Sequence, residues 1–160
     1  MPEPVNYQLT PSEMHIAAIV GVQRGLDAIR NKRPGRYGCG FDFDADIIGC
    51  MGEQALAKHL DRYWNGSFGD FKAVDVAHAY QVRASTFDGP TAGLLLHPGD
   101  HDDHPFIKVV VRLPVVSLVG WTMGRDGKRQ EYWKELQKGR PCFVVPDRTL
   151  RPMSELMDAL

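Results

Sequence analysis

The run from Phe106 to Met123 constrains the fold of this chain more than any other segment. Residues 106–112 and 115–123 are two strand-like apolar segments, and only Leu113-Pro114 joins them. So short a connection indicates neighbouring paired strands, and the continuous valines indicate strands that are buried on both faces. The sequence therefore predicts a sheet whose centre or packed half lies here, with helices covering it.

The first helix is predicted from its start signal. Thr10 suits an N-cap, Pro11 suits the first helical position, and Glu13 completes a capping box. The helix is expected to run to about Arg30, with Val22, Leu26 and Ile29 at helical spacing. The basic run 30–36 is expected to end it, either as cations that suit a helix C-terminus or as a phosphate contact.

A second helix is predicted over residues 46–64, after a Gly-rich linker at 37–40. Glu53 falls on one stripe of this helix with Ala57, Leu60 and Trp64, so its carboxylate lies among residues that favour burial. A buried carboxylate must be paired, protonated or bound to a metal. Two interpretations follow: a metal ligand, or a glutamate at the edge of the stripe that pairs with an arginine or reaches water.

Two strand-like segments, 71–76 and 80–85, are separated by only three residues, so they predict an antiparallel hairpin. If the turn centres on His78, Asp75 lies opposite Gln81, and Arg83 shares their face. Side chains opposite each other on paired strands stand about 5 Å apart at their Cβ atoms. The Asp75 carboxylate and the Gln81 amide oxygen would then be close enough to share one ion. The alternative is a solvated strand face with a cross-strand Asp–Arg pair.

Further elements are expected downstream. We predict a short strand at 94–96, a helix at about 130–137, a buried strand at 142–145 and a C-terminal helix that starts at 150–153. Segment 97–105 gathers Asp and His residues between prolines, which is typical of a polar loop and also suits a metal site. Asp100 or Asp103 is a candidate to point toward Asp75.

The order of a helix Glu, a strand Asp and a Gln-x-Arg strand resembles the PD-(D/E)XK nuclease superfamily. A more detailed pattern resembles small phage-associated proteins and spans roughly residues 49–146. Its motifs are Gly49-x-x-Gly52-Glu53-x-Ala55, Val74-Asp75-Val76, Gln81-Val82-Arg83, Asp100-x-Asp102-Asp103, Gly120-Trp121, and Arg140-Pro141 followed by Val145-Pro146.

This resemblance implies a restriction-endonuclease-like core and metal-dependent hydrolysis of DNA. Glu53, Asp75 and Gln81 would hold Mg²⁺ or Mn²⁺, and Arg83 would take the place of the usual lysine. Arg83 stays protonated, so it suits clamping a phosphate rather than acting as a base. Gln81 replaces the more usual Glu and supplies a neutral ligand. These departures leave open an alternative: an inactive nuclease fold that binds DNA or a protein partner, as in a phage accessory or defence-interfering factor.

The charges are segregated along the chain. Residues 42–104 carry eleven acids and four bases, whereas residues 105–151 carry ten bases and four acids. This distribution suits acids that hold a cation and bases that hold a polyanion, although solvated faces would give the same count. The candidate DNA-binding residues are Arg33, Arg36, Arg125, Lys128, Arg129 and Lys134.

Length and composition predict one mixed α/β (α+β) domain over residues 1–160, with a mostly antiparallel sheet flanked by helices. Residues 1–45 would form the N-terminal helix and linker, and residues 46–160 the core. Three cysteines without C-x-x-C spacing argue against a disulfide framework. We expect a cytoplasmic protein with no membrane segment.

Overall fold

The valine-rich segments form the centre of a four-stranded sheet. In the computed structural model, β4 (Pro105–Arg112) pairs antiparallel with β5 (Val115–Met123), and the sheet order is β1-β5-β4-β2. Strand β1 (Val5–Gln8) is antiparallel to β5, and β2 (Gln81–Ser85) is parallel to β4. The structure describes residues 1–33, 42–66, 76, 79–89 and 91–156.

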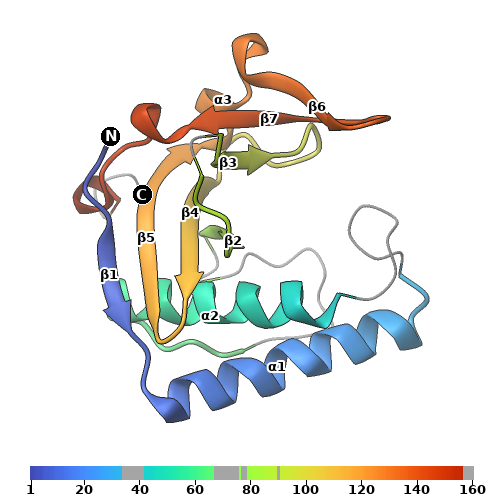
Figure 1. Cartoon of the computed structure of the whole chain (residues 1–160), viewed down its shortest axis with the longest axis vertical. Coiled ribbons are helices and arrows are strands. Elements are labelled where there is room, and N and C mark those ends of the chain that lie inside the picture. Colours follow the sequence, from blue (N-terminus) through green and yellow to red (C-terminus); the bar gives the residue numbers. More distant parts are fainter. Residues whose placement is uncertain (34–41, 67–75, 77–78, 90, 157–160) are drawn as a thin grey trace.

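Two helices cover one face of this sheet. Helix α2 (Phe43–His59) packs directly on the sheet, and α1 (Pro11–Arg30) packs on α2 as an outer layer (Figure 1). The core between α2 and the sheet includes Leu56, Val82, Ile107, Val109 and Leu118. Alternate residues of β4 therefore point toward the helices.

A second, three-stranded sheet covers the other face. It has the order β3-β7-β6 and is antiparallel throughout, and it crosses the end of the first sheet in Figure 1. Its strands are β3 (Gly93–Leu96), β6 (Trp133–Gln137) and β7 (Arg140–Pro146). Phe106 and Val110 of β4 join Leu94 and Leu96 of β3 in a second apolar cluster. Burial of β4 on both faces is thereby confirmed.

The described chain is a mixed α+β fold with mostly antiparallel sheets, as the sequence predicts. The start of α1 is also confirmed: the Thr10 side chain accepts a hydrogen bond from the Glu13 backbone, and the Glu13 side chain accepts one from the Thr10 backbone. The one-turn helix α3 (Gly124–Gly127) follows β5. Short 3-10 turns occupy Gln130–Tyr132, Asp147–Thr149 and Met153–Glu155.

Several predicted boundaries were wrong. Helix α2 begins at Phe43, with the Asp42 side chain as its N-cap, and it ends at His59. Asp61 has a φ of 50°, and a left-handed residue of this kind ends a helix. The predicted C-terminal helix is a 3-10 turn at Met153–Glu155 in the described residues. Strand β1 was not predicted.

The predicted helix at 130–137 is a strand over most of its length. A 3-10 turn at Gln130–Tyr132 leads into β6, and Lys138-Gly139 then turns the chain back into β7. Gly139 has a φ of 76°, which glycine adopts at no steric cost. Trp133 contacts the Phe143 ring edge-to-face at 4.8 Å, a cross-strand contact that stabilises the hairpin.

Candidate functional site

Helix α2 lies unusually close to strand β2 at Gly52. A Cβ atom at this position would lie 2.9 Å from Cβ of Ala84 and 3.0 Å from Cγ1 of Val82. Glycine removes that clash, so the helix backbone rests on the edge strand. The next residue, Glu53, is consequently held inside the helix–sheet layer, where it is 3% exposed.

Two donors satisfy the buried carboxylate of Glu53. Arg24 of α1 forms a two-pronged ion pair with it, at 2.5 Å and 2.9 Å, and Nε1 of Trp64 donates a third hydrogen bond at 3.0 Å. A bidentate guanidinium is the strongest side-chain partner for a carboxylate. The structure thus shows the arginine pairing that the sequence left open, and a metal ion at Glu53 would have to displace Arg24.

The Gln-x-Arg segment lies on the edge strand β2, and its side chains alternate between the two faces. Val82 belongs to the core beneath α2, so Gln81 and Arg83 point to the other face, toward the second sheet. Arg83 forms an ion pair there with Asp100, at 2.8 Å and 2.9 Å, and lies over the Phe106 ring.

Asp75 lies outside the described residues, so its predicted pairing with Gln81 stays a prediction. The nearest described contact is an antiparallel bridge between Val76 and Tyr80. This bridge is centred on residue 78, which is the register that the predicted pairing requires.

The predicted catalytic residues that the structure describes do not converge on one site. Glu53 belongs to the helix side of the sheet, whereas Gln81 and Arg83 belong to the opposite side. Within the described ranges, no group of three or more His, Cys, Asp or Glu side chains is placed to hold a metal ion.

The Asp- and His-rich segment after β3 forms ion pairs with basic side chains of the same protein. Asp100 pairs with Arg83 and also accepts a hydrogen bond from the His97 backbone. Asp102 pairs with Lys128 at 2.8 Å, and Asp103 pairs with Arg125 at 3.1 Å. The hydrogen bond from Lys128 lowers the pKa of Asp102 below its ordinary value. The segment thus ties α3 and the residue after it to the β3–β4 connection, in line with the polar-loop interpretation.

Several of the predicted DNA-binding residues already have an acidic partner within the protein. Arg125 and Lys128 face carboxylates, Arg33 pairs with Asp27, and Arg129 lies 3.7 Å from Glu131. Lys134 is exposed on β6. Arg36 lies outside the described residues.

One ionic residue went unnoticed in the sequence. Lys108 of β4 is paired in register with Arg83 of β2, is 3% exposed, and binds Asp147 at 2.6 Å and 2.7 Å. Together, Arg83–Asp100 and Lys108–Asp147 place two ion pairs side by side between the sheets. A lysine inside an apolar strand was the available signal, because a buried amine requires a counter-charge.

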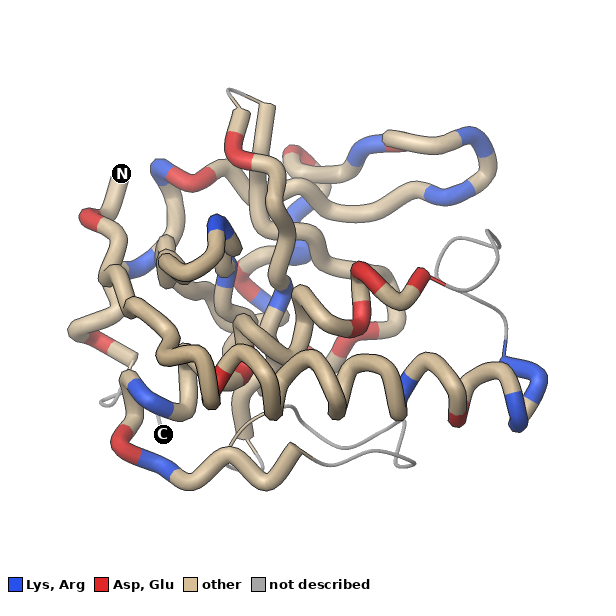
Figure 2. The backbone as a smooth tube through the Cα atoms, turned by 60° about the horizontal axis from the view of Figure 1, so that its bottom comes forward, with Lys and Arg blue, Asp and Glu red and all other residues tan. Residues whose placement is uncertain are grey.

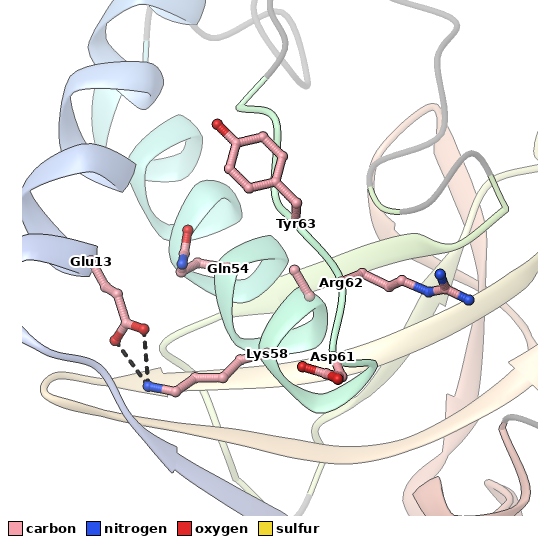
Figure 3. A pocket seen from close by; sticks show the side chains of 7 residues that line it. Glu13, Gln54, Lys58, Asp61, Arg62 and Tyr63 are labelled. Carbon is pink, nitrogen blue, oxygen red and sulfur yellow. Dashed lines mark hydrogen bonds and ion pairs between the residues drawn. The ribbon is translucent and has the colours of Figure 1, made fainter.

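A shallow pocket of about 360 Å³ lies where the start of α1 meets the end of α2 (Figure 3). Its lining includes the ion pair of Glu13 with Lys58, at 3.0 Å, and the exposed side chains of Asp61, Arg62 and Tyr63. None of the predicted catalytic residues lines it.

No family model matches this chain, and comparisons with curated proteins and with solved structures also find no match. Membership of the nuclease superfamily therefore stays a prediction. Among the described helices, none is both long and apolar enough to cross a membrane.

Proposed function

We propose that this protein binds DNA through the β6–β7 hairpin. The observation that carries the proposal is the exposure of this hairpin: every residue of β6 is exposed, and the turn Lys138-Gly139 extends from the body of the protein. Residues 133–140 carry three bases and one acid. Figure 2 shows basic segments along the projecting hairpin.

Two lysines of this hairpin differ from the paired cations described above. Neither Lys134 nor Lys138 forms an ion pair with any residue that the structure describes. Lysines of this kind can neutralise phosphates and release counterions without first breaking an internal bond. Trp133 is 38% exposed beside them, so it offers part of its ring to a base or a sugar.

The test is fluorescence anisotropy with labelled single- and double-stranded oligonucleotides over a range of salt concentrations. The double variant Lys134→Ala/Lys138→Ala should weaken binding and reduce the salt slope by about two, roughly one for each phosphate that is no longer neutralised. Arg62→Ala, an exposed arginine that follows α2 and is not one of the candidate DNA-binding residues, is the control and should bind as the wild type does. Equal binding by the double variant and the wild type would refute the proposal.

Metal-dependent hydrolysis of DNA is a second candidate, and the arrangement of β2 favours it. Gln81 and Arg83 share one face, Asp100 reaches that face, and the Val76–Tyr80 bridge has the register that the predicted Asp75–Gln81 pairing requires. Arg83 is placed to clamp a phosphate if the substrate displaces Asp100. By resemblance, Glu53, Asp75 and Gln81 would hold Mg²⁺ or Mn²⁺.

The described residues alone do not fit such an ion. Gln81 and Asp100 supply one amide and one carboxylate, and Arg83 already occupies the carboxylate. Arg24 and Trp64 likewise occupy Glu53. Hard divalent cations need more oxygen ligands than these side chains leave. The binding function is therefore the one that the geometry supports better.

Plasmid and single-stranded DNA incubated with Mn²⁺ separate the two candidates. Cleavage by the wild type, lost in both Glu53→Ala and Asp75→Ala while anisotropy shows unchanged binding, would establish the hydrolase. Absence of cleavage by a wild-type protein that binds DNA would leave binding as the function.

A further inference from the structure

We propose that a second copy of this chain packs against the outer face of α1, antiparallel, to form a dimer. This face carries five large aliphatic side chains that are 38–53% exposed: Ile16, Ile19, Val22, Leu26 and Ile29. They are spaced by three or four residues, so they form one stripe about 20 Å long. Scattered exposed aliphatic residues are ordinary, but a continuous stripe over four turns marks an interface.

The opposite face of α1 is already used by α2, and small residues make that contact. A Cβ on Gly21 would lie 2.6 Å from Cα of Ile47, and a Cβ on Gly25 would lie 2.6 Å from the Phe43 ring. The helix thus buries mainly small residues, together with Val20, and leaves five large aliphatic residues exposed. This is the reverse of an ordinary surface helix, whose large apolar residues face the core.

The stripe is self-complementary when two helices run in opposite directions. Four of its residues are symmetric about the midpoint between residues 22 and 23, so Ile16 lies opposite Ile29 of the second copy and Ile19 lies opposite Leu26, and Val22 lies beside the midpoint. A two-fold dimer requires such a patch, because each residue meets its partner twice. Spacings of three and four residues also suit the shallow crossing angle of antiparallel helix pairs.

The charges at the two ends favour the same direction. Arg30 and Lys32 lie at the C-terminal end of α1, and Glu13 lies in its first turn. Figure 2 shows α1 as a long element with few charged segments and a basic end. A parallel pair would bring the two basic ends together, whereas an antiparallel pair separates them and opposes the helix dipoles.

One helix pair lies at the small end of the interface range of about 1,200–2,000 Å². We therefore expect a monomer–dimer equilibrium in the micromolar range, measurable by sedimentation equilibrium over a series of concentrations. Ile19→Lys and Leu26→Glu should each raise the dissociation constant at least about tenfold, because each leaves an unpaired charge in an apolar contact. Leu136→Glu, at a similarly exposed leucine on β6, is the control and should dimerise as the wild type does.

Mixing the two variants tests the direction of the helices. In an antiparallel heterodimer, Lys at position 19 of one chain meets Glu at position 26 of the other, and the second contact keeps its native Ile19–Leu26 pair. An equimolar mixture of I19K and L26E should therefore regain the dimer that each variant alone loses. A wild-type protein that stays monomeric at every concentration would overturn the proposal, as would a mixture that fails to recover. If the wild type were monomeric and L26E had a lower Tm than the wild type, another segment of the same chain would cover the aliphatic stripe. The dimer would then be excluded.

Discussion

At the residue scale, the sequence left two interpretations of Glu53: a metal ligand, or a glutamate that pairs with an arginine or reaches water. Its neighbours in the structure decide between them. Its stripe predicted burial, and burial requires a compensating charge or a proton. Arg24 supplies that charge from another helix, 29 positions earlier in the chain. The spacing of Arg24 and Glu53 in the sequence does not predict this ion pair, since the pair depends on how α1 crosses α2.

This ion pair gives a stability prediction. Arg24→Leu should lower the free energy of unfolding by about 3 kcal/mol, because it leaves the Glu53 charge buried with only Trp64 as a donor. Adding Glu53→Leu should recover most of that loss, since the double variant has no buried charge. Urea unfolding followed by circular dichroism measures both. A neutral effect of Arg24→Leu would show that the pair is not needed.

The capping box of α1 gives a prediction about pH. Partial burial raises the pKa of Glu13, but hydrogen bonds from the Thr10 backbone and from Lys58 outweigh it, so the pKa lies below the ordinary 4.5. The stabilisation is therefore fully present above pH 4.5 and is lost as the pH falls through the lowered pKa. Glu13→Gln should cost about 1 kcal/mol at neutral pH and less near pH 2, because the wild-type carboxyl gains a proton as the pH falls through its lowered pKa. A cost that stayed constant across urea titrations at the two pH values would contradict this.

At the element scale, two glycines of α2 have opposite roles that the sequence does not distinguish. Gly52 faces β2, where a Cβ would meet Ala84 and Val82 at about 3 Å, whereas a Cβ at Gly49 would have no neighbouring atom within 4 Å. The same substitution thus meets a packed strand at one position and open space at the other.

Gly52→Ala should therefore destabilise the protein by about 1–3 kcal/mol, because α2 must move away from the edge strand. Gly49→Ala should stabilise it by about 0.5–1 kcal/mol through higher helix propensity. Thermal unfolding of the two variants measures the difference. Stabilisation by both would show that α2 does not approach β2 closely.

The segment 130–137 shows where local reasoning failed among the elements. Its lysine, glutamates and glutamines are good helix formers, so propensity favoured a helix. The structure instead pairs Trp133 with Phe143, and Gly139 provides the turn. Propensity is a weak prior, and pairing with β7 outweighs it here.

At the scale of the whole molecule, the two sheets pack together through β4 and are joined by an ion pair of a buried lysine. Lys108 on β4 binds Asp147, which follows β7 of the second sheet. Apolar residues of β4 enter both hydrophobic clusters. The two layers should therefore unfold together.

Asp147→Ala tests this coupling. It strands the Lys108 charge at 3% exposure and should lower stability by about 3–5 kcal/mol. Far-ultraviolet circular dichroism, which follows mainly the helices, and tryptophan fluorescence should still give one coincident transition. Separate transitions would mean that the second sheet folds on its own.

The sequence alone determined the fold class, the start of α1 and the pair of strands β4 and β5 that is buried on both faces, because caps, turns and hydrophobic periodicity are local signals. It also placed Glu53 on an apolar stripe of the second helix, with pairing to an arginine as one of its alternatives. Only the tertiary structure decided that Arg24 holds the Glu53 carboxylate, that Arg83 and Glu53 lie on opposite sides of the sheet, and that five large aliphatic side chains of α1 face outward. These outcomes depend on which elements become neighbours, and that is set by packing between segments far apart in the chain, where no local pattern carries the information.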